Sequence, residues 1–257
     1  MISSTNSPKP DLVLWTGPVW AGNLARVKWS HTTEIMTLSC EGSDNCASIG
    51  YNLPAAGKLE ALLRSRGKKT DSYDKIFLGS FSAGHGLSNL ILSDPESANR
   101  ISGFGAFDSY YTGPAPGLKK GYLAYANLAA SGDGHLMWTS CSGIPDRKWL
   151  SCEDSIKPLL DAIGPSEDSL PADLDQVLKA PEYFVKKYGF VHAFYNLKYK
   201  HAEHATVVAP AVFEHWLSPL AHGEPPGSWT EKGFIAAGAV LTALAGWKLG
   251  KYLRRSR

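Results

Sequence analysis

Residues 73–86 read YDKIFLGSFSAGHG, and this stretch decides the fold. Its apolar run at 76–78 predicts a buried strand, and a helical pattern begins a few residues later. Between them stands Ser82, with Ser80 two residues before it and Gly84 two residues after it. A strand, a tight turn with a central serine and a helix form the context in which a G-x-S-x-G pattern exposes a nucleophilic serine.

The turn at Ser82 places demands on its neighbours. The serine takes a strained backbone conformation, so the residues two positions away must be small, and Ser80 meets that demand although glycine is usual there. The N-terminus of the following helix favours negative charge that develops beside the serine. A plain turn between a strand and a helix is the alternative, so an acid and a histidine must follow in the right order.

Strands and helices alternate along residues 1–220. The predicted strands are 11–15, 34–39, 75–78, 101–107, 135–140 and 190–197, and the predicted helices are 55–66, 122–130, 152–163 and 206–217. This alternation is typical of an α/β fold, so we expect one domain with a mostly parallel central sheet and helices on both faces.

The C-terminal part differs in composition from the rest. Residues 221–232 form a Pro/Gly-rich linker, residues 233–253 are apolar apart from Lys248 and Lys251, and residues 254–257 are a basic end. A spanning helix needs roughly 20 apolar residues, so we predict a transmembrane or membrane-associated helix at 233–253; a helix docked on the core is the alternative. The N-terminus shows no secretory signal, so we expect a protein that is membrane-associated through this helix and otherwise cytoplasmic.

The charge distribution excludes a nucleic-acid-binding function. The formal net charge is +2 at pH 7, but the last ten residues contain five basic residues and no acid, so the remaining chain carries −3 (2 − 5). A mildly acidic body lacks the basic surface that nucleic acids require. The chain also has no C-x-x-C pair and no His/Cys cluster with metal-ligand spacing, so we expect neither a metal nor a cofactor.

The four cysteines permit two interpretations. Because no secretory signal is seen, we expect free or buried thiols. Two local disulfides, Cys40–Cys46 and Cys141–Cys152, are the alternative for a domain that meets an oxidising compartment.

A serine alcohol is activated when a histidine takes its proton and a carboxylate orients that histidine. Asp108 is the first candidate for the acid, because it ends the predicted strand that follows the helix after Ser82; Asp146, after the next strand, is the alternate. His201 and His204 lie between the last predicted strand and the closing helix, where the histidine is expected, and both are candidates for the base. His85 is expected to line the pocket.

Five short segments together resemble a known family: FSAGHG at 81–86, DSYY at 108–111, TSCSGI at 139–144, HAEH at 201–204 and WL at 216–217. Over roughly residues 10–220 the chain resembles the α/β-hydrolase superfamily, and within it a group of bacterial hydrolases with an F-S-A-G-[YH]-G elbow. The resemblance implies a minimal sheet of about six strands, Asp108 as the acid and His201 as the base, with His204 as the alternate base.

The resemblance further implies serine-hydrolase chemistry. Our first hypothesis is an esterase or lipase-like enzyme that forms an acyl-enzyme on Ser82 from a small-molecule or lipid-like carboxylic ester. The oxyanion would be held by the backbone N–H of Ala83 and by a second N–H from the loop after the first strand, for which Val19 is the first candidate and Trp20 the second. A peptidase or amidase with the same triad is one alternative. A catalytically inactive binding domain of the same fold is the other.

Overall fold

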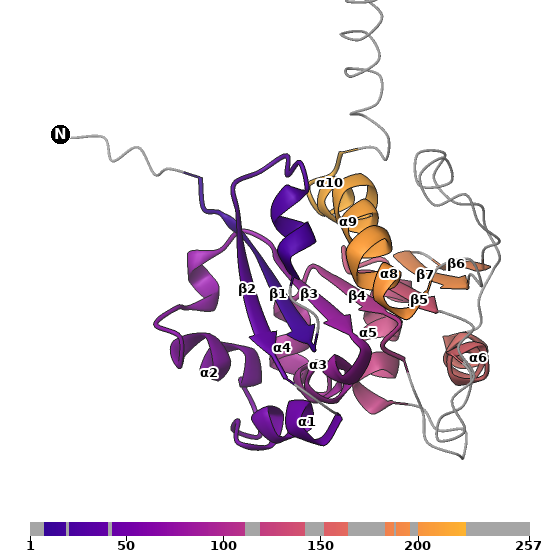
Figure 1. Cartoon of the computed structure of the whole chain (residues 1–257), viewed down its shortest axis with the longest axis horizontal. Helices are drawn as coiled ribbons and strands as arrows, with labels where there is room; N and C mark the ends of the chain where they lie inside the picture. The colour runs from indigo at the N-terminus through magenta and orange to yellow at the C-terminus, as the bar shows by residue number, and fades with distance from the viewer. Residues whose placement is uncertain are drawn as a thin grey trace, which may run out of the picture.

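A computed structural model describes residues 8–18, 21–40, 43–110, 119–141, 152–163, 183–187, 189–195 and 200–224. In this part of the chain, seven strands form one sheet in the order β2-β1-β3-β4-β5-β7-β6 (Figure 1). All neighbouring strands are parallel except β6 and β7, which are antiparallel. The strands are β1 (Asp11–Gly17), β2 (Thr33–Ser39), β3 (Ile76–Phe81), β4 (Gly103–Phe107), β5 (Leu136–Cys141), β6 (Tyr183–Lys187) and β7 (Gly189–Tyr195). The predicted mostly parallel α/β sheet is confirmed.

Helices cover both faces of this sheet (Figure 1). Along β1, Leu12 and Leu14 belong to one buried cluster, whereas Val13 and Trp15 belong to the other. A strand buried on both faces reads as a continuous apolar run, which is why the first strand was visible in the sequence. The described helices are α1 (Ser43–Tyr51), α2 (Lys58–Arg64), α3 (His85–Leu92), α4 (Pro95–Arg100), α5 (Lys120–Ser131), α6 (Cys152–Ile163), α8 (His201–Glu203), α9 (Ala209–Val212) and α10 (Ser218–Ala221).

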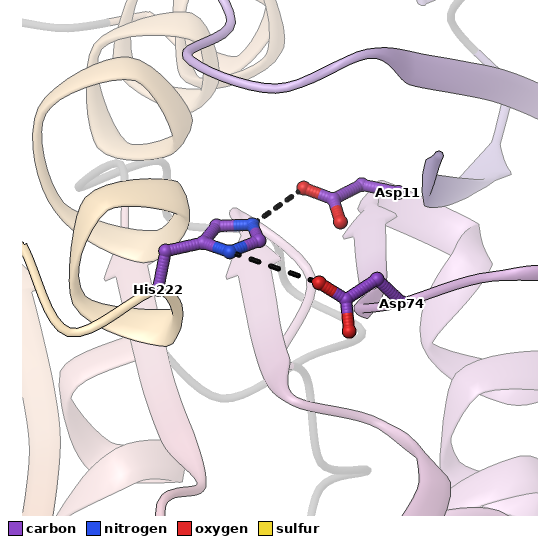
Figure 2. A group of neighbouring side chains, drawn as sticks. All are labelled: Asp11, Asp74 and His222. Carbon is purple, nitrogen blue, oxygen red and sulfur yellow. Dashed lines mark hydrogen bonds and ion pairs between the residues drawn. The ribbon is translucent and has the colours of Figure 1, made fainter. Parts of the chain in front are cut away.

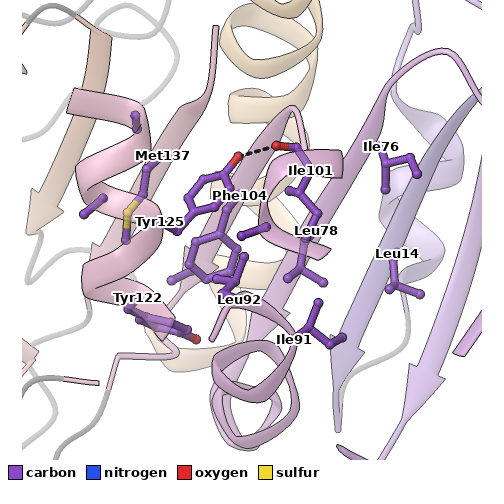
Figure 3. Close-up of a cluster of buried hydrophobic side chains, with 14 of the residues drawn as sticks. Leu14, Ile76, Leu78, Ile91, Leu92, Ile101, Phe104, Tyr122, Tyr125 and Met137 are labelled. Carbon is purple, nitrogen blue, oxygen red and sulfur yellow. Dashed lines mark hydrogen bonds between the residues drawn. The ribbon is translucent and has the colours of Figure 1, made fainter. Parts of the chain in front are cut away.

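The larger cluster lies between the sheet and helices α3 and α5 (Figure 3). Phe104 of β4 contacts the rings of Tyr122 and Tyr125 at centroid distances of 4.8 and 5.9 Å. The hydroxyl of Tyr125 donates a hydrogen bond of 2.8 Å to the carbonyl oxygen of Ile101, so this buried polar group is satisfied. The predicted helix at 122–130 is therefore present as α5, with its tyrosines turned inward.

The closing segment covers the other face. Phe213 and Trp216 are fully buried there, and Phe213 contacts the ring of Phe77 on β3 at 6.2 Å. The predicted helix at 206–217 is present, but π-helical turns at His204–Val208 and Phe213–Leu217 interrupt its α-helical geometry. π-Turns in helices are frequent near functional sites.

Several elements were not predicted. Strand β6 pairs with β7, with Lys187 opposite Gly189, and its five residues show no regular apolar alternation. The sheet therefore has seven strands rather than about six. Helices α1 and α4 were also missed, because each is short and carries few apolar residues.

The cysteine prediction is corrected for one pair. Cys40 and Cys46 form a disulfide, where we expected thiols. The reason is geometric: Cys40 directly follows β2, Cys46 lies in α1, and their two Cα atoms are 5.0 Å apart. The side chains of Cys141 and Cys152 lie outside the described part of the structure.

The C-terminal predictions lie almost entirely outside the described residues, which end at Glu224. This applies to the apolar segment at 233–253, to the basic end at 254–257 and to most of the linker at 221–232. Within the described ranges, no helix has the length and apolar character needed to cross a bilayer.

Candidate active site

Ser82 directly follows β3 and is the first residue of a short 3-10 turn (Ser82–Gly84), after which α3 begins. Its φ is 49°, in the left-handed region that a non-glycine residue rarely adopts. Strands β1 and β3 are neighbours in the sheet. From β1 the chain continues to β2 on one side, and from β3 it continues to β4 on the other side. The turn thus sits where α/β sheets bind ligands, at the carboxyl ends of the strands on either side of such a reversal.

The elbow turn passes very close to the end of β1. A Cβ atom on Gly84 would overlap the backbone carbonyl of Thr16, so only glycine fits at this position. The hydroxyl of Thr16 in turn donates to the carbonyl oxygen of Gly79 on β3 at 3.2 Å. The second glycine of the motif therefore has a packing reason, since it lets the helix approach β1.

Asp108 follows β4, the strand next to β3. It is fully buried and has a φ of 43°. Ser82 and Asp108, which directly follow these adjacent strands, are the two non-glycine residues with positive φ in the described part of the chain. Two backbone hydrogen bonds hold it: its N–H donates to the carbonyl oxygen of Ser140 at 2.7 Å, and its carbonyl oxygen accepts the N–H of Ser82 at 3.1 Å. Strain of this kind persists only where surrounding contacts impose it, and it is concentrated at functional sites.

His201 begins the closing segment and reaches the carboxylate of Asp108. Its Nδ1–H donates to Oδ2 at 2.6 Å, and its ring lies 4.6 Å from that of Phe81, the residue before Ser82. With the Nδ1–H directed at the carboxylate, Nε2 keeps its lone pair and can accept a proton. The histidine side chain is 37% exposed, whereas the aspartate is inaccessible. In the described part of the chain no hydrogen bond joins Ser82 to His201; such contacts are often long before substrate binds.

His204 occupies a different environment. It is fully buried, and its Nδ1 forms a hydrogen bond of 3.0 Å with Oγ of Ser140 on β5. The hydrogen bond to Asp108 is thus made by His201, whereas His204 bonds to Ser140. The alternate acid Asp146 and the oxyanion candidates Val19 and Trp20 lie outside the described residues, while Ala83 is described and is partly exposed directly after Ser82.

His85 is buried in the first turn of α3 and faces Lys119. Its Nδ1 is 3.3 Å from Nζ of Lys119. Burial, together with this neighbouring ammonium, lowers the pKa of His85 to about 3, and burial lowers the pKa of Lys119 to about 8. An imidazole with so low a pKa is a weak proton acceptor at neutral pH, which argues against His85 as a base.

A group of buried hydroxyls behind the elbow was not foreseen. Ser80 is fully buried, and its Oγ lies 2.6 Å from Oγ of Ser109, the residue after Asp108. Ser88 and Tyr122 continue this group from α3 and α5. The serine at position 80, which departs from the usual glycine, was the one signal in the sequence that pointed to it.

A second cluster of titratable side chains lies where β1 begins, at the amino ends of the strands rather than at their carboxyl ends (Figure 2). The imidazole of His222 stands between two carboxylates, with Nε2 2.8 Å from Asp11 and Nδ1 4.0 Å from Asp74. These three side chains could each offer one ligand atom to a metal. Each ring nitrogen already faces its own carboxylate, however, so we interpret the cluster as a structural contact that holds His222 against the start of β1.

Comparisons with known proteins add little to this geometry. No family model and no curated protein sequence matches the chain. Among solved structures, it is similar to the crystal structure of LpqC, a poly(3-hydroxybutyrate) depolymerase from Bordetella parapertussis, with a TM-score of 0.49 and 14% identity over 88% of this chain and 84% of that chain. A likeness at this level says nothing about the chemistry of the present chain.

Proposed function

We propose that the protein is a serine hydrolase that cleaves carboxylic esters through Ser82, His201 and Asp108. The observation that carries the proposal is the 2.6 Å hydrogen bond between His201 and Asp108, which are 93 positions apart and meet beside the strained turn of Ser82. A histidine held by a buried carboxylate next to an accessible serine is the arrangement that activates a serine alcohol.

Acylation begins when Oγ of Ser82 attacks the carbonyl carbon of the ester and Nε2 of His201 takes the hydroxyl proton. The carboxylate of Asp108 stabilises the imidazolium that results. The carbonyl oxygen becomes an oxyanion, which accepts a hydrogen bond from the N–H of Ala83 and a second one from the loop after β1, where Val19 is the first candidate. Each such donor contributes about 3 kcal/mol to transition-state stabilisation.

The tetrahedral intermediate then collapses. The bond to the alcohol oxygen breaks, His201 returns its proton to that oxygen, and the acyl group remains on Ser82. Water enters, gives a proton to His201 and attacks the acyl carbon; breakdown of the second intermediate releases the acid and restores the serine hydroxyl. Every proton in the cycle passes through Nε2 of His201, so the Nδ1 contact with Asp108 persists throughout.

The proposal is tested by labelling the whole chain with a fluorophosphonate, which phosphonylates only activated serines. We expect labelling of the wild type, none of Ser82→Ala or His201→Ala, and retained labelling of His204→Ala if that variant folds. An unlabelled, folded wild type would favour an inactive binding domain instead. Turnover of a p-nitroanilide in preference to p-nitrophenyl acetate would move the assignment to an amidase or peptidase.

A further inference from the structure

Four buried hydroxyls form a continuous chain that ends on the backbone of the candidate nucleophile. Tyr122 OH is 2.8 Å from Oγ of Ser88, which is 3.1 Å from Oγ of Ser80, which is 2.6 Å from Oγ of Ser109. The hydroxyl of Ser109 then donates to the carbonyl oxygen of Ser82 at 2.9 Å. All four hydroxyl-bearing residues are inaccessible to solvent, so water cannot replace these partners.

The last acceptor sets the direction of the whole chain. A carbonyl oxygen only accepts, so the proton of Ser109 points at Ser82 and Oγ of Ser109 must accept from Ser80. The proton of Ser80 is thereby used, and Oγ of Ser80 accepts from Ser88, whose proton is shared with the carbonyl oxygen of Gly84 at 3.1 Å. Because the proton of Ser88 is used in this way, Tyr122 donates at the far end, and its single proton is shared between Oγ of Ser88 at 2.8 Å and the carbonyl oxygen of Ser109 at 3.3 Å. Hydrogen bonds arranged in one direction polarise one another.

The end point matters because the carbonyl oxygen of Ser82 and the N–H of Ala83 belong to one peptide group. Withdrawing electron density from the oxygen increases the positive charge on the N–H. We propose that the hydroxyl chain from Tyr122 to Ser109 polarises this peptide and so strengthens the Ala83 N–H as the oxyanion donor. These residues are positioning residues that act through the peptide, and the inference rests on the proposed hydrolase function.

The size of the effect follows from two general magnitudes. One oxyanion donor contributes a factor of roughly 10²–10³ to kcat. Cooperative polarisation strengthens a hydrogen bond by about 10–30%. If the same percentage is taken of the logarithm of that factor, the hydroxyl chain raises kcat about twofold to eightfold.

The test compares two tyrosines of the same helix. Tyr122→Phe removes the far end of the chain, whereas Tyr125→Phe removes an equally buried hydroxyl that donates to Ile101 and touches no member of the chain. With p-nitrophenyl acetate we expect kcat to fall about twofold to eightfold in Tyr122→Phe, with KM unchanged, and to stay at the wild-type value in Tyr125→Phe. Affinity for a trifluoromethyl ketone, whose adduct with Ser82 carries the oxyanion, should fall by the same factor as kcat.

Ser109→Ala provides the second measurement, because it removes the hydrogen bond to Ser82 itself. It should lower kcat and ketone affinity at least as much as Tyr122→Phe. Equal kinetic effects of the two tyrosine variants, or losses that follow their melting temperatures alone, would overturn the inference. Fluorophosphonate labelling of the wild type separates the two proposals. If the wild type is labelled and kcat of Tyr122→Phe is unchanged, the proposed role of the hydroxyl chain is refuted and the hydrolase assignment stands.

Discussion

Replacing Asp108 by asparagine tests the active-site geometry most directly. Asparagine has the same shape, tolerates the left-handed φ of 43° and keeps the backbone hydrogen bonds to Ser140 and Ser82, so the fold should survive. Its amide N–H, however, donates a hydrogen bond to Nδ1 of His201 across the 2.6 Å contact. The histidine then carries its own proton on Nε2 and cannot take the one from Ser82.

The magnitude follows from the same contact. The imidazolium formed in the transition state and the carboxylate have charge centres about 4 Å apart, and unit charges at that distance attract by about 4 kcal/mol at an effective dielectric constant near 20. Loss of that term slows the reaction roughly 10³-fold, since 1.36 kcal/mol corresponds to a factor of ten. The wrong tautomer adds to the loss, and such substitutions in serine proteases reduce kcat about 10⁴-fold. We therefore expect a reduction of about 10³–10⁴-fold.

The assay is the rate of fluorophosphonate labelling, which needs no knowledge of the natural substrate, together with circular dichroism of the folded variant. Asp133→Asn is the matched control, because Asp133 is exposed and precedes β5, at the end of the strands away from Ser82. We expect this variant to be labelled at the wild-type rate. Asp146→Asn addresses the alternate acid. If Asp108→Asn labelled within about tenfold of the wild type while Asp146→Asn did not label, the carboxylate at 108 would be excluded as the orienting acid.

Three further predictions concern the stability of the fold. Gly84→Ala should destabilise the fold by roughly 3 kcal/mol because the new methyl group overlaps the backbone of β1, and an unchanged urea midpoint would contradict this. Reducing the Cys40–Cys46 disulfide, which closes a loop with a sequence separation of 6, should lower the free energy of unfolding by about 2 kcal/mol; a midpoint insensitive to reductant would show that the bond adds nothing. The hydroxyl and N–H of Thr70 lower the pKa of Glu60 to about 2, so the carboxylate stabilises the fold above pH 4.5 and this contribution is lost as the pH falls through about 2. Glu60→Gln should lower the free energy of unfolding by about 1 kcal/mol at pH 7. If the difference in stability between wild type and variant did not shrink as the pH is lowered, the ionised carboxylate would not be its source.

Part of the candidate site was visible in the sequence. The strand-turn-helix context of Ser82 followed from a short apolar run and the small residues around it, and Asp108 and His201 followed from their places after predicted strands. The predicted strands were found because buried parallel strands carry apolar runs. Short elements with mixed composition, such as α1 and β6, left no comparable pattern.

By itself, the sequence determined the features that depend on neighbouring residues: the alternating elements, the sharp turn at Ser82 and the need for small residues beside it. Only the tertiary structure decided which distant groups meet. It placed His201 within hydrogen-bond distance of Asp108 and aligned hydroxyls from β3, α3 and α5 behind Ser82. The physical reason is that propensity and periodicity act within a few residues along the chain, whereas these contacts depend on strand order and helix packing, which bring together side chains separated by tens of residues.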